Sequence, residues 1–523
     1  MNIRQLSMEK PLIELIDEAC ERYADDICLQ YKDEKYTYAE VRQESIKVAQ
    51  GLAGEGFRKG MHGAIYSLNS ARAFIVTLGI IRAGGVWLPI NPRNSDEDNI
   101  RIIKRFGCQA LFYQYAFSGV ARSMCNSLED IKVSVCLDQE AGCPGYETWL
   151  KDSIKEEPTF ERTPQDIVSI PMTGGTTGEP KGVVLSDRNF RYMMKGSFDT
   201  LVVRGEQPVQ LCAAPMTHGG GRAVLCFMSV GARFVVLDRV DPQEVLQTIH
   251  RERVSDLFLP PTAIYALLAQ PNVRDFDYSC LREVTYASAP MSQTQLRLAV
   301  EVFGPVMQGV FGQTECPMHI TRFPPEEHFI NGELAPESRL KSVGRVTTVS
   351  EVAILDDDCE ELPIGELGEI GVKGGIVAEG YYQDPEETAK IRKNGWHLTG
   401  DIGYLDADGY LFIVDRKKDM IISGGFNVYS SEVEQAIATL EGVTCAAVIG
   451  VPHEHWGEEV TALVQRSEGS VITSEEIIVA CKKKIGGVKA PKRVEFVVDF
   501  PKTPIGKIDK KALKSRYSVE VIS

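Results

Sequence analysis

The sequence predicts an α/β protein with a large N-terminal domain of parallel-rich sheets covered by helices, a β-rich subdomain and a small α+β C-terminal domain. In the first two thirds of the chain, strand-like runs alternate with helix-like segments, a pattern typical of parallel sheets covered on both faces. After about Val349, strand-like runs cluster between Asp/Gly turns such as 406–409. A charged segment, 415–419, precedes a last stretch with its own helices and strands. We therefore expect domains at 1–417 and 418–523.

The elements of the N-terminal domain follow from apolar periodicity and from capping residues. A helix is expected to begin after Asp241, because Pro242 suits its first position and Glu244 completes a capping pattern. The other expected helices are 39–52 and 74–82, and the expected strands are 86–90, 110–113, 133–137, 167–172, 209–213, 234–237, 256–259, 284–287 and 306–311. The β-rich subdomain is expected to contain strands at 352–355, 368–372 and 410–414.

The C-terminal domain is expected to contain two capped helices among three strands. Ser431 and Glu434 predict a capping box for the first helix, and Thr473 and Glu476 predict one for the second. The expected strands are 443–449, 460–464 and 494–498.

Length, composition and charge limit the class of protein. A chain of 523 residues exceeds one ordinary core, and its 43% hydrophobic and 25% charged residues are typical of a soluble globular enzyme. The net charge of −16 argues against nucleic-acid partners and against a basic membrane-docking face. The 13 cysteines include no Cys-x-x-Cys pair, which indicates reduced thiols rather than a disulfide framework or a zinc site. No apolar run is long enough to cross a bilayer and no signal peptide is evident, so we expect a cytoplasmic protein without an integral membrane segment.

A glycine-rich segment follows a strand-like run that ends at Met172. Its glycines permit a tight turn and a close approach to a ligand, its threonine hydroxyls and backbone N–H groups can surround a phosphate, and its lysine adds a positive charge. The spacing is not that of a Walker A loop. A flexible surface loop is the alternative, and the ordered Thr-Thr-Gly-x-Pro-Lys-Gly directly after a strand disfavours it. The residues concerned are Thr173, Gly174, Gly175, Thr176, Thr177, Gly178 and Lys181.

Five further motifs occur in the same chain. They are Phe-Gly-Gln-Thr-Glu at 311–315, Gly-Trp-His-Leu-Thr-Gly-Asp at 395–401, Asp-Gly-Tyr-Leu-Phe-Ile-Val-Asp-Arg-Lys-Lys-Asp at 408–419, Gly-Gly-Phe-Asn-Val-Tyr at 424–429 and Pro-Lys-Thr-Pro-Ile-Gly-Lys at 501–507. In this order and spacing, the six motifs resemble those of the adenylate-forming superfamily. That superfamily contains acyl-CoA synthetases, adenylation domains of non-ribosomal peptide synthetases, and firefly luciferase. The resemblance extends from about Tyr36 to Lys507 and covers nearly the whole chain.

The resemblance implies a two-step reaction that uses Mg-ATP and CoA. A carboxylate attacks the α-phosphate of ATP to give an acyl-adenylate and pyrophosphate, and a thiol then displaces AMP. Donors and cations at the α-phosphate lower the barrier, because negative charge builds there. The glycine-rich segment resembles the phosphate-binding loop, Thr314 the threonine that contacts the α-phosphate, and Glu315 the carboxylate that holds Mg²⁺.

The same resemblance implies residues that hold the adenosine. Asp401 resembles the aspartate that accepts both ribose hydroxyls, and Arg416 resembles a second ribose contact. An aromatic ring that stacks on adenine is usually a tyrosine in this family, and the phenylalanine found here keeps the stacking face. The adenine pocket is expected to include Ser288, Ala289, Pro290, Phe311 and Gly312.

Two lysines are implied to serve the two half-reactions. Lys507 resembles the catalytic lysine of the first step, which reaches between the α-phosphate and the attacking carboxylate. Lys418 aligns with the hinge about which the small domain rotates, so that this domain is expected to be mobile. Rotation would bring Gly424, Gly425 and Phe426 to the site, where glycines let the thin pantetheine arm of CoA pass. Without the resemblance, Lys507 would be read as a solubilising charge and 415–419 as a solvated charged run.

The acyl pocket is expected to involve His218, Gly219, Gly220 and Val310. His218 either gates or lines the pocket or is a packed loop histidine, and the glycines would leave room for an acyl group. A valine at 310, where many long-chain activators have glycine, hints at a medium-chain, aromatic or cyclic acid. The stretch 214–221 lacks the aspartate that pairs with the amino group of α-amino acids, so such a substrate is disfavoured. The acid is therefore expected to be fatty (medium or long), aromatic or cyclic.

Three functions remain open at this point. The first is an ATP-dependent acyl-CoA ligase. The second is a stand-alone enzyme that adenylates an acyl or aryl acid and loads a carrier protein, and it is disfavoured because no carrier domain is fused. The third is a non-catalytic nucleotide-binding scaffold, which is disfavoured because Lys507, Glu315, Asp401 and Arg416 are all present. The protein is expected to be a monomer or a homodimer.

Overall fold

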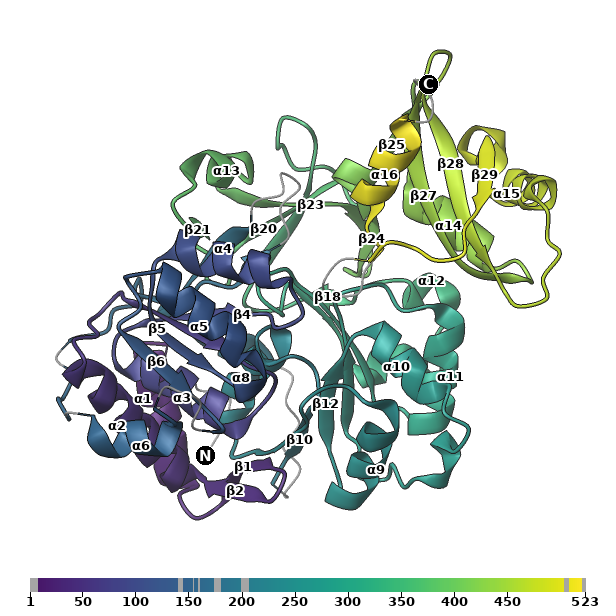
Figure 1. Ribbon diagram of the computed structural model, residues 1–523. Coiled ribbons are helices and arrows are strands. Elements are labelled where there is room, and N and C mark those ends of the chain that lie inside the picture. Colours follow the sequence, from purple (N-terminus) through teal and green to yellow (C-terminus); the bar gives the residue numbers. More distant parts are fainter. Residues whose placement is uncertain are drawn as a thin grey trace. The chain divides into compact units, whose positions relative to one another are not determined.

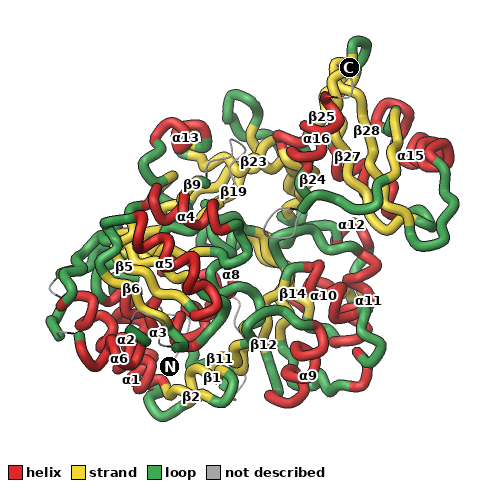
Figure 2. Tube along the Cα trace, viewed as in Figure 1, coloured by secondary structure: helices red, strands yellow, loops and turns green. Residues whose placement is uncertain are grey.

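The computed structural model describes residues 8–139, 144–153, 155–158, 160–173, 180–198, 207–502 and 508–519. The chain divides into two compact units, one of Met1–Val352 with Val372–His397 and the other of Ala353–Gly371 with Leu398–Ser523. Helices and strands are mixed throughout, and the sheets are rich in parallel pairs (Figures 1 and 2). The α/β class and the parallel-rich sheets predicted from the sequence are confirmed. No helix within the described ranges is both long enough and apolar enough to cross a membrane.

An eight-stranded sheet in the first unit has a parallel centre, because β4, β3, β5 and β6 all pair in parallel. β3 and β4 are buried at every position, as expected for strands covered on both faces. The antiparallel β9 extends this sheet beyond β7. In spatial order the strands are β21 (Gly380–Tyr381), β9 (Lys181–Ser186), β7 (Ile167–Ser169), β4 (Val86–Ile90), β3 (His62–Tyr66), β5 (Cys108–Tyr113) and β6 (Val133–Cys136), with β8 (Met172–Thr173) paired to β9.

A nine-stranded sheet follows in the same unit. In the spatial order β14, β13, β12, β10, β11 and β1, each strand pairs in parallel with the next. β15 is antiparallel to β14. Spatial order departs from chain order, since β12 lies beside β10 rather than beside β11. The strands are β18 (Arg345–Val346), β15 (Thr321–Phe323), β14 (Met307–Phe311), β13 (Glu283–Tyr286), β12 (Asp256–Leu259), β10 (Val209–Cys212), β11 (Arg233–Val236), β1 (Ile27–Tyr31) and β2 (Glu34–Thr37).

The helices of the first unit cover both sheets. One apolar cluster joins α1, α3, α7 and α8 to strands of both sheets, including Phe234 of β11 and Leu185 of β9. Figure 2 shows α9, α10 and α11 along one side of the nine-stranded sheet. The helices are α1 (Leu12–Arg22), α2 (Tyr38–Gly54), α3 (Ala71–Arg82), α4 (Asp96–Phe106), α5 (Ser118–Ser127), α6 (Tyr146–Asp152), α7 (Asp187–Phe198), α8 (Gly219–Met228), α9 (Pro242–Glu252), α10 (Pro261–Leu268), α11 (Gln293–Phe303), α12 (Glu337–Leu340) and α13 (Pro385–Lys390). A two-stranded hairpin, β16 (Phe329–Ile330) and β17 (Glu333–Leu334), completes the unit.

The second unit holds the β-rich part and the C-terminal α+β part. A five-stranded sheet contains β19 (Glu351–Leu355), β20 (Gly368–Lys373), β23 (Trp396–Leu405), β22 (Arg392–Lys393) and β24 (Leu411–Arg416), and the division between the units passes through β19, β20 and β23. The last sheet contains β26 (Phe426–Val428), β25 (Ile421–Ser423), β28 (Gly457–Arg466), β27 (Val443–His453) and β29 (Arg493–Phe496). The helices α14 (Ser430–Ala438), α15 (Ser474–Lys489) and α16 (Lys510–Val519) accompany it.

The starts of three helices test the capping predictions. Asp241 accepts a hydrogen bond from the Glu244 amide at α9, and Thr473 forms the complete capping box with Glu476 at α15, both as predicted. The box predicted at Ser431 is wrong. Instead, the buried Asp415 carboxylate accepts from the Ser431 amide at 3.2 Å and from the Ser430 hydroxyl, so a distant residue caps α14.

These bonds also explain where the units divide. Asp415 is the last residue but one of β24, and its bonds tie the end of this strand to α14 within the second unit. The predicted boundary at 417/418 falls inside this unit, because the β-rich residues before it cluster with the C-terminal part.

Candidate active site

The glycine-rich segment joins two paired strands. Thr173 at the end of β8 is the cross-strand partner of Lys181 at the start of β9. The Lys181 ammonium pairs with Glu387 and lies 5.3 Å from the centre of the Tyr381 ring. This contact, together with Lys390, lowers the pKa of the Glu387 carboxyl to about 2. The Lys181 ammonium is therefore held in place where the segment meets β9. The other predicted residues of the segment lie outside the described residues: Gly174, Gly175, Thr176, Thr177 and Gly178.

Glu315 lies shortly after the end of β14 and is held by two donors. The Tyr381 hydroxyl donates to Glu315 Oε1 at 2.7 Å, and the Ala378 amide donates to the Glu315 backbone oxygen at 2.8 Å. Burial, reinforced by the neighbouring Glu315 carboxylate, raises the pKa of Tyr381 well above its ordinary value. The tyrosine therefore remains a hydrogen-bond donor throughout the physiological pH range.

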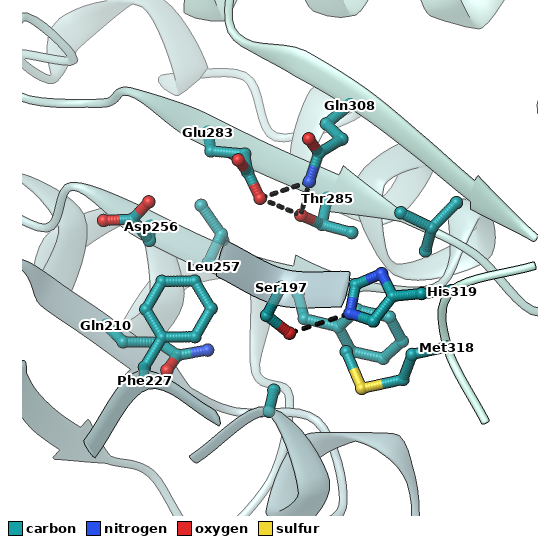
Figure 3. A pocket seen from close by; sticks show the side chains of 13 residues that line it. Ser197, Gln210, Phe227, Asp256, Leu257, Glu283, Thr285, Gln308, Met318 and His319 are labelled. Atoms are coloured by element: carbon teal, nitrogen blue, oxygen red, sulfur yellow. Dashed lines mark hydrogen bonds between the residues drawn. The ribbon is translucent and has the colours of Figure 1, made fainter. Parts of the chain in front are cut away.

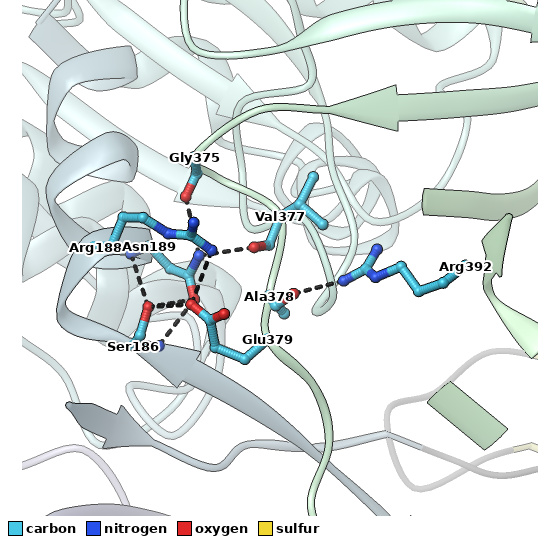
Figure 4. Close-up of polar contacts among 8 residues, drawn as sticks. All are labelled: Ser186, Arg188, Asn189, Gly375, Val377, Ala378, Glu379 and Arg392. Carbon is cyan, nitrogen blue, oxygen red and sulfur yellow. Dashed lines mark hydrogen bonds and ion pairs between the residues drawn. The ribbon is translucent and has the colours of Figure 1, made fainter. Parts of the chain in front are cut away.

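The segment that carries Ala378 is itself braced by α7 (Figure 4). Asn189 donates to the carbonyl oxygens of Gly375 and Val377, both at 2.9 Å. Glu379 accepts from the Ser186 hydroxyl at 2.6 Å and from Arg188 at 2.9 Å. These bonds fix the backbone that holds Glu315, so its carboxylate is positioned before any ligand binds.

The sequence interpretation missed two arginines near Glu315, one buried and one half-buried. Arg222 is buried on α8, and burial lowers its pKa to about 10 while the charge of Glu315 opposes the shift. Arg392 donates to the Ala378 carbonyl at 2.5 Å, and burial lowers its pKa too. An arginine in the otherwise apolar run 219–228 was the signal available for the first of them. Their charges favour an anionic ligand at this place.

The donor set around Glu315 fits Mg²⁺. A hard cation prefers carboxylate and phosphate oxygens, and Mg²⁺ in nucleotide sites usually takes one or two protein carboxylates together with substrate phosphates. Across the described ranges, no group of three or more His, Cys, Asp or Glu side chains could hold a metal ion by itself. Glu315 would therefore bind the ion jointly with nucleotide phosphates.

The predicted adenine residues follow two neighbouring parallel strands. Phe311 ends β14 and Ser288 comes shortly after β13, and the two strands pair through Tyr286 and Gly309. Ser288 has φ +72°, a left-handed conformation that is uncommon for serine and recurs at binding sites. Ser288, Ala289 and Pro290 are exposed and Phe311 is half-buried, so these residues are accessible to a ligand, while Thr314 and Gly312 lie on the same half-buried turn.

The two predicted ribose contacts lie side by side in the second unit. Asp401 of β23 and Arg416 of β24 are cross-strand partners, and Arg416 Nε lies 2.8 Å from Asp401 Oδ1. Asp401 is buried, whereas the Arg416 side chain is 48% exposed. The pair presents a carboxylate and a guanidinium at one place.

The hinge and CoA candidates lie in the same unit. Lys418 is exposed in the short 3₁₀ turn Lys417–Asp419. Gly424 and Gly425 have φ of +60° and +81°, which a residue with a side chain rarely adopts. Phe426 beside them is 59% exposed. Lys507 lies outside the described residues.

The residues predicted to line the acyl pocket differ in their surroundings. Burial, with Arg222 nearby, lowers the pKa of His218 to about 4, so its imidazole is neutral near pH 7. A Cβ on Gly219 would meet the Phe258 ring at 3.3 Å, whereas one on Gly220 would lie 2.7 Å from the Ala214 carbonyl oxygen. Gly220 thus permits close packing of the α8 backbone, and of these two glycines only Gly219 faces a side chain of the cavity described next.

A small cavity, partly open to solvent, lies beside the end of β14 (Figure 3). Val310 lines it, one residue before Phe311. Its apolar wall comes from Ala223, Phe227, Leu257, Phe258, Val310 and Met318, and its polar wall from Ser197, Gln210, Asp256, Glu283, Thr285, Gln308 and His319. The sequence interpretation included Val310 but missed the polar wall.

Family models match both parts of the chain. The model of AMP-binding enzymes matches residues 16–382, and that of the AMP-binding enzyme C-terminal domain matches residues 432–507.

The chain is similar to curated CoA ligases that are named for different acids. The chain is 38% identical over 364 residues to the medium/long-chain-fatty-acid–CoA ligase FadD8 of Mycobacterium tuberculosis, a match that covers 68% of this chain and 62% of that protein, less than two thirds of its length. It is 32% identical over 505 residues to 4-coumarate–CoA ligase 2 of Solanum tuberosum, with 94% of this chain and 90% of that protein covered.

Solved structures share the fold. ATP-bound MatB from Rhodopseudomonas palustris superposes with a TM-score of 0.87 at 28% identity, covering 97% of this chain and 99% of that chain. The amide bond synthetase McbA from Marinactinospora thermotolerans superposes equally well, with a TM-score of 0.87 at 28% identity and coverages of 97% and 100%.

Proposed function

Since the chain belongs to the AMP-binding enzyme family and is an AMP-forming acid–thiol ligase, we propose that it joins a carboxylic acid to CoA. In the first step an oxygen of the acid attacks the α-phosphorus of ATP, and pyrophosphate leaves as the acyl-adenylate forms. In the second step the CoA sulfur attacks the acyl carbon, its thiol proton is lost, and AMP leaves with the electrons of the broken C–O bond.

The observation that carries this proposal is the positioned carboxylate of Glu315. Held by Tyr381 and by the braced segment at Ala378, it would bind Mg²⁺ together with the phosphates. The ion would offset the charge that builds on the α-phosphate. Thr314, one residue earlier, would donate to the same phosphate, and Lys181 with the glycine-rich segment would hold the remaining phosphate oxygens.

The remaining assignments extend the proposal to the second unit. Asp401 and Arg416 would hold the ribose, and Lys507 would stabilise the first transition state. Lys418 would be the hinge between domains 1–417 and 418–523. Its exposure and the turn it occupies support that role. After rotation, the backbone at Gly424 and Gly425 would admit the pantetheine arm.

The thiol acceptor distinguishes the candidate functions. Curated relatives named as CoA ligases favour CoA. A carrier protein is the second acceptor, and the similarity to an amide bond synthetase adds an amine as a third. A non-catalytic scaffold is disfavoured, because Glu315 is held ready for a cation.

The test is mass spectrometry of products formed by purified protein with Mg-ATP, CoA and a pooled panel of short, medium and long fatty acids, benzoates, cinnamates and cyclic acids. An acyl-CoA product is expected. Glu315→Gln should reduce its formation at least about tenfold, whereas Glu333→Gln in the exposed hairpin should not. Acyl-adenylate without any CoA product would overturn CoA as the acceptor, and neither product would overturn the ligase assignment.

A further inference from the structure

One face of the nine-stranded sheet carries a row of polar side chains across adjacent strands. Gln210 of β10, Asp256 of β12 and Glu283 of β13 are successive cross-strand partners. Two residues further along β13, Thr285 is paired with Gln308 of β14. Because side chains alternate between the faces of a strand, all five lie on the same face. These five residues form most of the polar wall of the cavity beside Val310.

Part of this row is a satisfied internal network. The Glu283 carboxylate accepts from the Thr285 hydroxyl at 2.7 Å, from Gln308, and from Arg322 at 3.5 Å. Arg322 also donates to Gln308. Figure 3 shows Glu283, Thr285 and Gln308 bonded together on one side of the cavity. This part needs no ligand to complete it.

The other part of the row contains a buried acceptor that has no donor. Gln210 is only 3% exposed, and its amide oxygen has no hydrogen-bond partner in the described part of the chain. Asp256 is 5% exposed and accepts from the Ser255 hydroxyl, yet none of the ion pairs among the described residues includes it, in contrast to Glu283. A buried acceptor without a donor is costly, so the Gln210 amide oxygen indicates a missing donor, and the Asp256 carboxylate lies beside it on the neighbouring strand.

Asp256 can bond to a group that both donates and accepts. Burial, with the nearby charge of Glu283, raises the pKa of Asp256 to about 7. This carboxyl therefore takes up a proton more readily than an ordinary aspartate, and in its protonated form it offers a donor. A hydroxyl suits both forms, because it carries one donor and two acceptor lone pairs.

The polar row lies at a distance from the nucleotide motif that the end of an acid opposite its carboxylate could reach. Gln308 lies three residues before Phe311 on β14, about 10 Å away at the usual rise per strand residue. The partners Gln210 and Asp256 lie two residues deeper. Val310 lies between Gln308 and Phe311 on β14, and Met318 and the rings of Phe227 and Phe258 also line the cavity. An acid whose carboxylate lies towards Thr314 would extend past Val310 towards the row.

We propose that the acid activated by this enzyme carries a hydroxyl group at the end of its skeleton distant from the carboxylate, and that Gln210 and Asp256 bind this hydroxyl. The inference rests on the proposed ligase function and narrows its substrate class from fatty, aromatic or cyclic acids to those with a distal hydroxyl. A site built to hydrogen-bond a substrate hydroxyl rejects the analogue that lacks it far more strongly than an apolar pocket rejects an extra methylene.

The test compares matched acids with and without the distal hydroxyl. Linear acids of 6–16 carbons, aryl acids and fused-ring acids are each supplied in both forms, and kcat/KM for acyl-CoA formation is measured. The expected result is at least about tenfold preference for the hydroxylated member on the preferred skeleton. If no skeleton shows a preference for the hydroxylated member, the inference is overturned while the ligase function stands. If none of the acids gives an acyl-CoA product, the ligase function itself is overturned.

Variants test whether the polar row causes the preference for acids with a distal hydroxyl. Gln210→Met keeps the length of the side chain and removes its acceptor, so it should abolish the hydroxyl preference mainly through KM for the acid, with KM for ATP unchanged. Gln210→Glu retains an acceptor and should keep part of the preference. Gln30→Met alters a glutamine on β1 of the same sheet and away from the cavity, so the preference should persist. Thermal unfolding of each variant identifies any loss of fold. An unchanged preference in a folded Gln210→Met protein contradicts the assignment.

Discussion

The Tyr381 hydroxyl donates a hydrogen bond to Glu315 Oε1 across 2.7 Å, and so joins β21 to the turn that follows β14. The two residues are 66 positions apart in the chain. In the proposed mechanism this bond aims the carboxylate that holds Mg²⁺. Partners that orient a metal ligand are usually worth one to two orders of magnitude in metal affinity or activity.

Tyr381→Phe should therefore reduce pyrophosphate release about 10- to 100-fold at low Mg²⁺ and raise the Mg²⁺ concentration needed for half-maximal rate. The measurement is the initial rate of adenylation over a Mg²⁺ titration. Tyr382→Phe is the matched control, because its ring packs against His62 and Phe106 away from Glu315. An unchanged Mg²⁺ dependence in the Tyr381 variant would show that the hydrogen bond has no part in metal binding.

Lys507→Ala should abolish formation of the acyl-adenylate but leave thioester formation from supplied acyl-adenylate intact. The reason is that only the first step builds charge between the α-phosphate and the attacking carboxylate. Each half-reaction is measured separately by chromatography of AMP and acyl-CoA. Lys502→Ala removes an exposed charge from the same C-terminal stretch and should affect neither step. Equal loss of both half-reactions would rule out the role assigned to Lys507.

Lys418→Pro should spare pyrophosphate release and impair transfer of the acyl group to CoA. Proline fixes φ and removes a backbone donor, so it stiffens the turn at which rotation is proposed. Lys418→Ala removes the same charge and leaves the backbone free, and transfer should persist in it. Stopped-flow measurement of the two steps separates the outcomes. A proline variant blocked in adenylation alone would contradict the hinge.

The buried histidines predict a loss of stability in acid. Burial lowers the pKa of His218 and His328 to about 4, and that of His319 and His397 to about 3, from an ordinary 6.5. The unfolded chain therefore binds protons first as the pH falls. Stability present at pH 7 is lost below about 6.5, by up to about 1.4 kcal/mol per pH unit for each histidine.

His328→Gln should make the free energy of unfolding less dependent on pH between 6.5 and 4.5, by up to about 1.4 kcal/mol per pH unit. Denaturant titrations across that range measure the slope. His455→Gln changes an exposed histidine and should leave the slope as in the parent protein. The same slope in all three proteins would mean that His328 is not held neutral by burial.

Much of the fold could be predicted because its signals are local. The strand expected at 256–259 coincides with β12, and the caps at Asp241 and Thr473 form from residues three positions apart. Motif order likewise identified the superfamily. The capping box at Ser431 failed because Asp415, a residue of another element, competes for the same amide.

The sequence by itself determined the alternation of strands and helices, the nucleotide motifs and the type of chemistry, since each depends on residues close together along the chain. Only the tertiary structure decided that Tyr381 holds Glu315 and that Gln210, Asp256 and Glu283 form one row. In sequence these three are isolated polar residues in separate apolar strands. Sheet order and register, which depend on packing of the whole unit, bring their side chains to one face. The type of reaction can thus be inferred from the sequence, whereas the polar wall that would select the acid forms only in the folded protein.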